Sequence, residues 1–194
     1  MPDISLIDES DRGAVLVGAV MLEERLSQLI KDTICRNNIP ESHIKEMFNL
    51  NGPLSSFSSK SLICYGFGLI SKDIFDDLTK IRKLRNKMAH SLATVDFLSR
   101  DMKKDVMSIK CCINAANSFK GKRYNIKTNQ EGTDQDLPCT PPEWEMRTMG
   151  YVKSIKYIFC IGIYLLLIDI SKYQIYSIKS GVISALTCGA ATEQ

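Results

Sequence analysis

The chain has 194 residues and a formal net charge of +3, from 25 Lys and Arg against 22 Asp and Glu. Hydrophobic residues make up 44% of it, and a chain of this length buries roughly 70% of its extended surface on folding. One hydrophobic core is therefore expected without disulfides or structural metal. The small net charge excludes a protein whose whole surface binds phosphates, so any nucleic-acid contact would need a local cluster of cations.

The seven cysteines are odd in number, contain no C-x-x-C pair and mostly lie in apolar runs. This usage indicates a reducing cytoplasm, with no disulfide framework and no metal site. The N-terminus lacks the basic start and apolar core of a signal peptide. The most apolar run, residues 157–168, is shorter than the roughly 20 residues that a membrane helix needs, so we expect a buried helix and no membrane segment.

The first half of the chain predicts two helices. Apolar residues recur at helical spacing from Asp11 to about Ile34, with Asp11 placed to cap the start. A polar connection follows and ends in the turn signal Asn51-Gly52-Pro53. A second helix is expected over Leu54–Phe67, with Gly68 suited to its C-terminal cap.

Three more helices are predicted beyond Gly68. Ser71 is a good N-cap for a helix that runs through Leu92. Another helix is expected over Leu98–Phe119, and a last apolar one near 150–172. All these signals are helical, so the predicted fold is an all-α, single-domain helical bundle.

The predicted bundle spans residues 8–172. Residues 120–143 are rich in Gly and Pro and predict a loop or insertion, whereas residues 173–194 form a tail of uncertain structure. No internal repeat and no helix-turn-helix pattern with a basic recognition helix is visible in the sequence.

One helix carries most of the polar interest. Arg82, Asn86 and His90 stand four residues apart and share a stripe, while Arg85 falls at the margin of the apolar face. In a packing hypothesis, which the residues alone favour, Arg85 is buried in a salt bridge and the stripe hydrogen-bonds a neighbouring helix. In a functional hypothesis, Arg82 or Arg85 binds a phosphate, Asn86 orients it and His90 transfers a proton. Glu23, Glu24, Asp76 and Asp77 are candidate acid partners for Arg85.

Nine of the 25 cations lie in residues 80–87 and 120–127. In the second run, Lys122 and Arg123 beside Tyr124 could form a phosphate-binding loop, although a solvated basic loop is the more common outcome. His43 lies in the polar connection, where solvent exposure is expected. The sequence contains no Gly-rich nucleotide loop and no cluster with metal-ligand spacing, so we predict no cofactor and no metal.

Several segments together resemble the mannitol operon repressor (MtlR) family. They are Ser10–Ala19, Asn51–Ser58, Gly68–Ser71 and Asp77–Ser91, followed by a Pro-rich turn, Trp144 and an apolar last helix. The resemblance is strong over residues 8–115 and rests on the order of segments alone to about residue 170. It departs from the family at Lys60, where Arg is usual, and at Met88, where an aromatic residue is usual.

This resemblance implies an all-helical bacterial regulator that represses a sugar-alcohol uptake operon. Because family members lack an obvious DNA-binding motif, it implies repression through a protein partner. We expect the protein to be a homodimer, and its cysteine usage predicts a cytoplasmic location.

The run Arg85-Asn86-x-x-x-His90 also resembles the R-x4-6-H signature of HEPN-type ribonucleases. That resemblance implies an alternative function, metal-independent RNA cleavage in a toxin or phage-defence system. Arg85 would then stabilise the negative charge of the phosphate, and His90 would transfer a proton to or from the ribose hydroxyl. Asn86 would be the third catalytic residue. A regular helix separates Arg85 and His90 by about 140°, so a shared site needs a distorted helix end or a second subunit.

Overall fold

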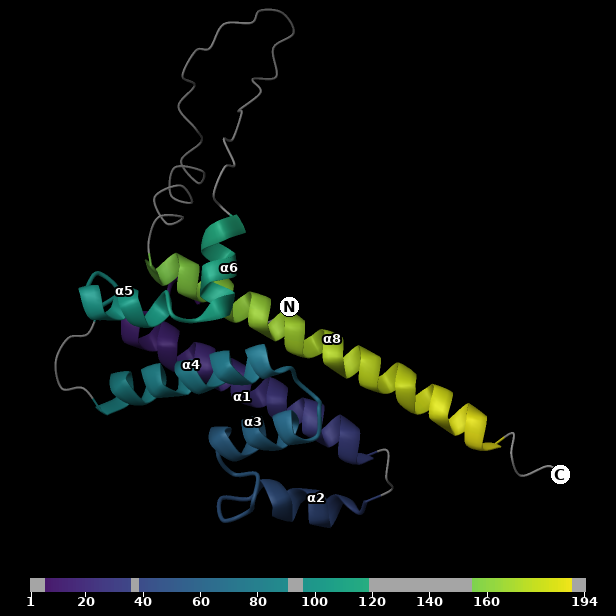
Figure 1. Ribbon diagram of the computed structural model, residues 1–194. Helices are drawn as coiled ribbons and strands as arrows, with labels where there is room; N and C mark the ends of the chain where they lie inside the picture. The colour runs from purple at the N-terminus through teal and green to yellow at the C-terminus, as the bar shows by residue number, and fades with distance from the viewer. Residues whose placement is uncertain (1–5, 36–38, 91–95, 119–154, 190–194) are drawn as a thin grey trace, which may run out of the picture.

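The computed structural model describes residues 6–35, 39–90, 96–118 and 155–189, with side chains of the last helix described as far as Lys172. These residues form seven helices and no strand, which confirms the predicted all-α fold (Figure 1). The helices are α1 (Asp11–Cys35), α2 (Glu41–Phe48), α3 (Phe57–Gly66), α4 (Lys72–His90), α5 (Arg100–Val106), α6 (Lys110–Ser118) and α8 (Ile155–Gly189).

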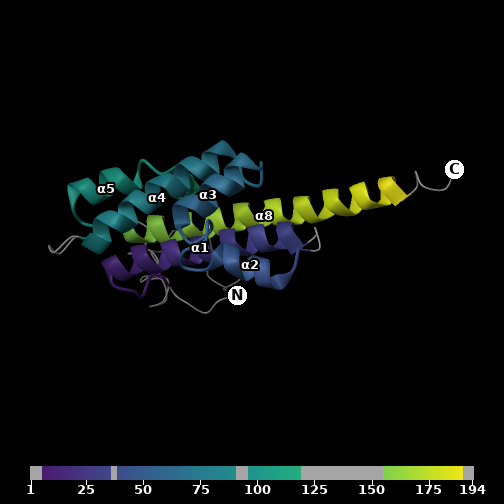
Figure 2. The same cartoon turned by 90° about the horizontal axis from the view of Figure 1, so that it is seen from below.

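Helix α1 lies at the centre of the bundle and packs against α8, α4 and α3. Its buried side chains repeat at helical spacing, among them Val15, Leu22, Leu26 and Leu29, and they form the face that the neighbouring helices cover. A Cβ on Gly18 would come within 3.3 Å of Ile163 Cγ1 on α8. The small residue at this position therefore lets the two helices, which run side by side in Figures 1 and 2, approach closely.

The prediction that Asp11 caps α1 is wrong. Ser10 is the capping residue, since its hydroxyl accepts a hydrogen bond from the Gly13 amide at 3.0 Å. The Asp11 carboxylate instead accepts a hydrogen bond from the Phe97 amide at 2.9 Å and lies 3.5 Å from Lys156 Nζ. Asp11 thus joins the start of α1 to segments far along the chain.

The second predicted helix is present but shorter than expected. Helix α3 begins after Ser56, whose hydroxyl accepts a hydrogen bond from the Ser59 amide at 3.0 Å. Gly68 has a φ of +68°, which confirms it as the left-handed residue that ends the helix. The polar connection before α3 contains the short helix α2, which the sequence did not predict because Ile44 alone among its residues is buried. His43 is exposed, as expected.

The prediction of one helix over Leu98–Phe119 is wrong. This region forms two helices, α5 and α6, which are separated after Val106. The cause lies on α4, where the buried carboxylate of Asp77 accepts hydrogen bonds from the Lys110 and Cys111 amides, both at 2.8 Å. A carboxylate at this point satisfies two N–H groups that a continuous helix would bond internally, so α6 starts afresh at Lys110.

Helix α4 begins after Ser71, whose hydroxyl accepts from the Ile74 amide at 3.4 Å, as predicted. The last helix begins at Ile155 and continues to Gly189, well beyond the predicted limit of 172. Its first half packs on α1 and α6, and its second half extends away from the other helices in both ribbon views (Figures 1 and 2). The predicted loop 120–143 and Trp144 lie outside the described residues.

Gly162 brings α8 close to α6. A Cβ at this position would lie 2.7 Å from Cys112 Sγ and 3.2 Å from the Cys112 backbone, whereas a Cβ on Gly66 would meet nothing within 4 Å. We therefore expect Gly162→Ala to destabilise the protein by about 1–2 kcal/mol despite its gain in helix propensity. Gly66→Ala should be neutral or stabilising by up to about 1 kcal/mol. Urea unfolding of both variants measures the difference, and equal stabilities would refute close packing at Gly162.

Four cysteines whose side chains the structure describes are core residues. Cys64, Cys111, Cys112 and Cys160 are all buried free thiols. Burial raises the pKa of Cys64 and of Cys160 to about 12, and a hydrogen bond to Cys112 together with burial raises the pKa of Cys111. The described residues hold no group of three or more potential metal ligands.

The shifted pKa of Cys64 makes stability depend on pH. Between its ordinary pKa of 9.0 and the folded value of about 12, the thiol ionises in the unfolded chain but stays neutral in the folded one, so stability falls as pH rises. We expect the stability advantage of wild type over Cys64→Ala to shrink by roughly 1.4 kcal/mol from pH 8 to pH 10. Chemical denaturation at both pH values tests this, and a constant difference would contradict it.

Candidate functional site

Arg82 of the predicted stripe and Arg85 of the predicted apolar margin line one small hollow between α1, α3 and α4. The hollow has a volume of about 230 Å³, and we call it the arginine hollow. Helix α4 contributes Arg82 and Arg85, α1 contributes Ala19, Val20 and Glu23, and the segment that starts α3 contributes Ser55, Ser56 and Phe57. It thus combines cations, hydroxyls and an apolar floor in a space suited to a compact ligand.

The packing hypothesis for Arg85 is wrong. Arg85 is exposed at the rim of the hollow, and its Nη1 donates to Asn86 Oδ1 at 3.1 Å. Arg82 is half-buried. Among the described residues no carboxylate forms an ion pair with either guanidinium, although Lys60, Lys87, Lys110 and Lys156 each have one. Arg85, at the margin of the apolar face of α4, borders a hollow because neither α1 nor α3 covers its side chain.

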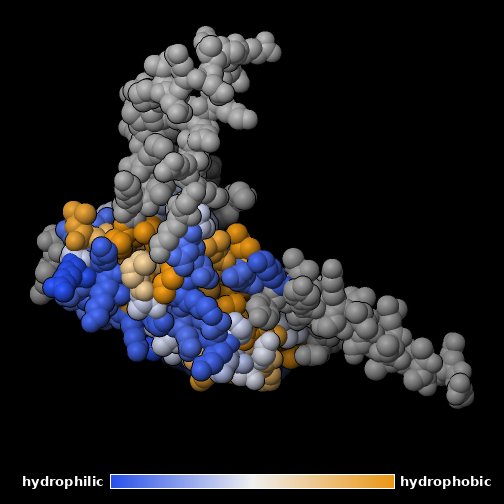
Figure 3. Space-filling model, turned by 45° about the horizontal axis from the view of Figure 1, so that its top comes forward, coloured by the Kyte–Doolittle hydropathy of each residue, from blue (hydrophilic) through white to orange (hydrophobic). Residues whose placement is uncertain are grey.

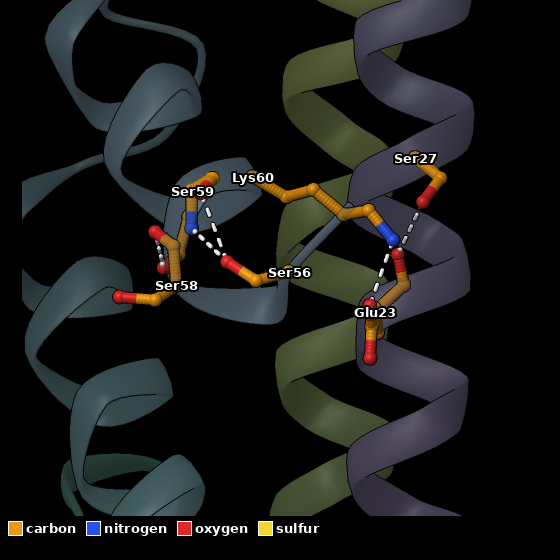
Figure 4. A network of polar contacts seen from close by, with 7 residues as sticks. Glu23, Ser27, Ser56, Ser58, Ser59 and Lys60 are labelled. Carbon is orange, nitrogen blue, oxygen red and sulfur yellow. Dashed lines mark hydrogen bonds and ion pairs between the residues drawn. The ribbon is translucent and has the colours of Figure 1, made fainter. Parts of the chain in front are cut away.

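Glu23, one of the acids proposed as a partner for Arg85, pairs with a different cation. Lys60 Nζ lies 2.7 Å from Glu23 Oε1, and the Lys60 side chain is only 11% exposed. Figure 4 shows Lys60 extending from α3 to α1 to make this contact, beside Ser56 and Ser59. The positive charge of Lys60 therefore neutralises the negative charge of Glu23. The net charge of the hollow then comes from the two arginines.

The other predicted site residues do not join the arginine hollow. His90 is exposed at the end of α4 and does not line the hollow, and Asn86 is half-buried beside Arg85. Asp77 is used as the cap of α6. Lys122 and Arg123, the predicted binding residues of the basic loop, lie outside the described residues. The structure thus brings together Arg82 and Arg85 and keeps His90 apart from them.

Sequence reasoning missed the contribution of Ser55, Ser56 and Phe57 to this site. The sequence predicts them as the start of a helix over Leu54–Phe67 and places them in a segment of the family resemblance, Asn51–Ser58, but assigns them no role in a site. No periodicity within α4 could reveal them, because the hollow forms only when α1 and α3 pack beside α4.

A second hollow, at the C-terminal end of α1, has a different character. Its volume is about 450 Å³, and apolar side chains such as Ile30, Met47 and Phe67 dominate its lining. Phe67 is 75% exposed at its edge. On the face seen in Figure 3, hydrophilic residues cover much of the left and lower part of the described surface, and hydrophobic residues gather along its upper edge. With no charged residue in its lining, the apolar hollow offers nothing for an anion.

The fold and the arginine hollow define an all-helical domain with a small cationic site on its surface. The family model described as the mannitol repressor, MtlR, matches residues 8–168, and the chain belongs to this family. A comparison with curated protein sequences found no match. No helix in the described part of the chain is long and apolar enough to cross a membrane.

A solved structure shares the fold. A chain of the X-ray structure of the MtlR–HPr complex from Escherichia coli is similar to this protein, with a TM-score of 0.58 and 15% sequence identity. The match covers 84% of this chain and 91% of that chain. It confirms the bundle architecture expected from the sequence resemblance.

Proposed function

We propose that this protein is a bacterial transcriptional regulator of the mannitol-repressor type that acts through a protein partner. The family match over residues 8–168 carries the proposal. The sequence has no helix-turn-helix pattern with a basic recognition helix, which agrees with regulation through another protein. We further propose that it works as a homodimer in the cytoplasm.

The partner to test first is HPr. The similar solved chain comes from an X-ray structure of an MtlR–HPr complex, which makes HPr the first candidate partner for this chain. An HPr from the same organism is the appropriate probe, because recognition surfaces diverge at 15% identity.

A gel-shift assay tests how the protein reaches DNA. The purified full chain is titrated onto the promoter region of the sugar-alcohol operon, alone and with HPr, against an unrelated fragment of equal length. We expect no sequence-specific shift by the chain alone at physiological salt. A tight shift of the promoter by the chain alone, absent from the control fragment, would contradict the proposal.

The ribonuclease alternative has a clear test of its own. His90 lies outside the arginine hollow that holds Arg85, so the geometry of one chain does not assemble the R-x4-6-H pair. We expect wild type and His90→Ala to leave RNA equally intact in EDTA. Cleavage by wild type that His90→Ala abolishes would favour the ribonuclease instead.

A further inference from the structure

We propose that the arginine hollow binds a compact phosphate monoester, with Arg82 and Arg85 holding the phosphoryl group. This site goes beyond the proposed regulatory function. Its test does not depend on whether the protein binds HPr. Its basis is a small pocket lined by two arginines that form no ion pair with any described residue, together with hydroxyl groups and apolar side chains.

The charge balance favours an anion. Arg82 and Arg85 line the hollow without a carboxylate partner in the described structure, while Glu23 is already paired with Lys60 at 2.7 Å. A half-buried guanidinium cannot lose its proton, so its charge is best satisfied by an incoming anion. Two guanidiniums three residues apart on one helix face can donate several N–H groups to a single tetrahedral oxyanion.

The remaining lining favours an ester over the free ion. Ser55 adds a hydroxyl, whereas Ala19 and Phe57 add apolar surface. Inorganic phosphate would leave that apolar surface uncovered, but the short organic part of a phosphate monoester would cover it. The volume of about 230 Å³ lies below the roughly 300–1,000 Å³ of sites for larger ligands, which limits the ligand to a small molecule.

Calorimetry on the full chain at constant ionic strength tests the proposal with sn-glycerol 3-phosphate, inorganic phosphate and glycerol as probes. We expect saturable binding of glycerol 3-phosphate, about fivefold tighter than inorganic phosphate, and no binding of glycerol. The double variant Arg82→Gln/Arg85→Gln should bind at least about tenfold more weakly. Arg100→Gln, which removes an exposed arginine of α5 away from the hollow, is the matched control and should bind like wild type.

Glu23→Gln provides a test in the opposite direction. It removes the one negative charge that lines the hollow and frees Lys60, so affinity should rise about two- to fivefold. Thermal unfolding of each variant establishes that it is folded. We expect the double variant to melt like wild type, because Arg82 and Arg85 form no ion pair in the described structure, and Glu23→Gln to melt lower, because it loses the ion pair with Lys60. Three results would overturn the proposal: no saturable binding up to about 20 mM, equal affinity for inorganic phosphate, or equal loss in Arg100→Gln and the double variant.

Discussion

Phe159→Ala should cost about 3–5 kcal/mol of stability, the largest effect that we expect from a single substitution. Phe159 lies on α8 with none of its surface exposed, and its ring centroid is 5.6 Å from that of Phe97. Truncation removes this ring contact and leaves a cavity where α8 meets the segment before α5. The melting temperature should fall by roughly 10 °C in a chain of this size.

Ile168→Ala is the control on the same helix. Its side chain is 53% exposed, so the loss should stay below about 1 kcal/mol. Thermal and urea unfolding of both variants make the comparison. A loss of similar size in both would contradict the placement of Phe159 in the core.

Asp77→Ala should destabilise the protein by about 3 kcal/mol, the second large effect. The Asp77 side chain is buried and accepts two amide hydrogen bonds, from Lys110 and Cys111. Without the carboxylate these buried N–H groups at the start of α6 lose their acceptor, and each such loss costs roughly 1–3 kcal/mol.

The neighbouring residue supplies the control for this prediction. Asp76 carries the same charge but is exposed, so Asp76→Ala should change stability by less than about 0.5 kcal/mol. Asp77→Asn keeps one acceptor oxygen and should lie between the two. Equal denaturation midpoints for Asp76→Ala and Asp77→Ala would show that Asp77 does not cap α6.

Local signals in the sequence predicted much of the fold. Apolar periodicity predicted α1, Ser71 predicted the start of α4, and Gly68 predicted the end of α3. The errors arose where a distant group decides the local structure. The break between α5 and α6 depends on Asp77, more than thirty residues earlier in the chain, and no pattern within residues 98–119 reveals it.

The candidate site was predicted only in part, for the same reason. Helical spacing placed Arg82 and Arg85 on neighbouring parts of α4. The functional hypothesis predicted that one of these two arginines binds a phosphate. The burial of Arg85 was wrong because the periodicity of one helix does not show whether a neighbour covers its margin. Glu23, Ser55 and Ser56 enter the hollow from α1 and the start of α3, a juxtaposition that tertiary packing alone creates.

The most direct measurement of the central claim is a calorimetric titration of the purified full chain with HPr from the same organism. A regulator that acts through this partner predicts a saturable 1:1 complex per chain, with a dissociation constant in the range of about 0.1–10 μM. No detectable heat and no co-elution at concentrations of about 100 μM, from a chain that circular dichroism shows to be folded and helical, would contradict the account.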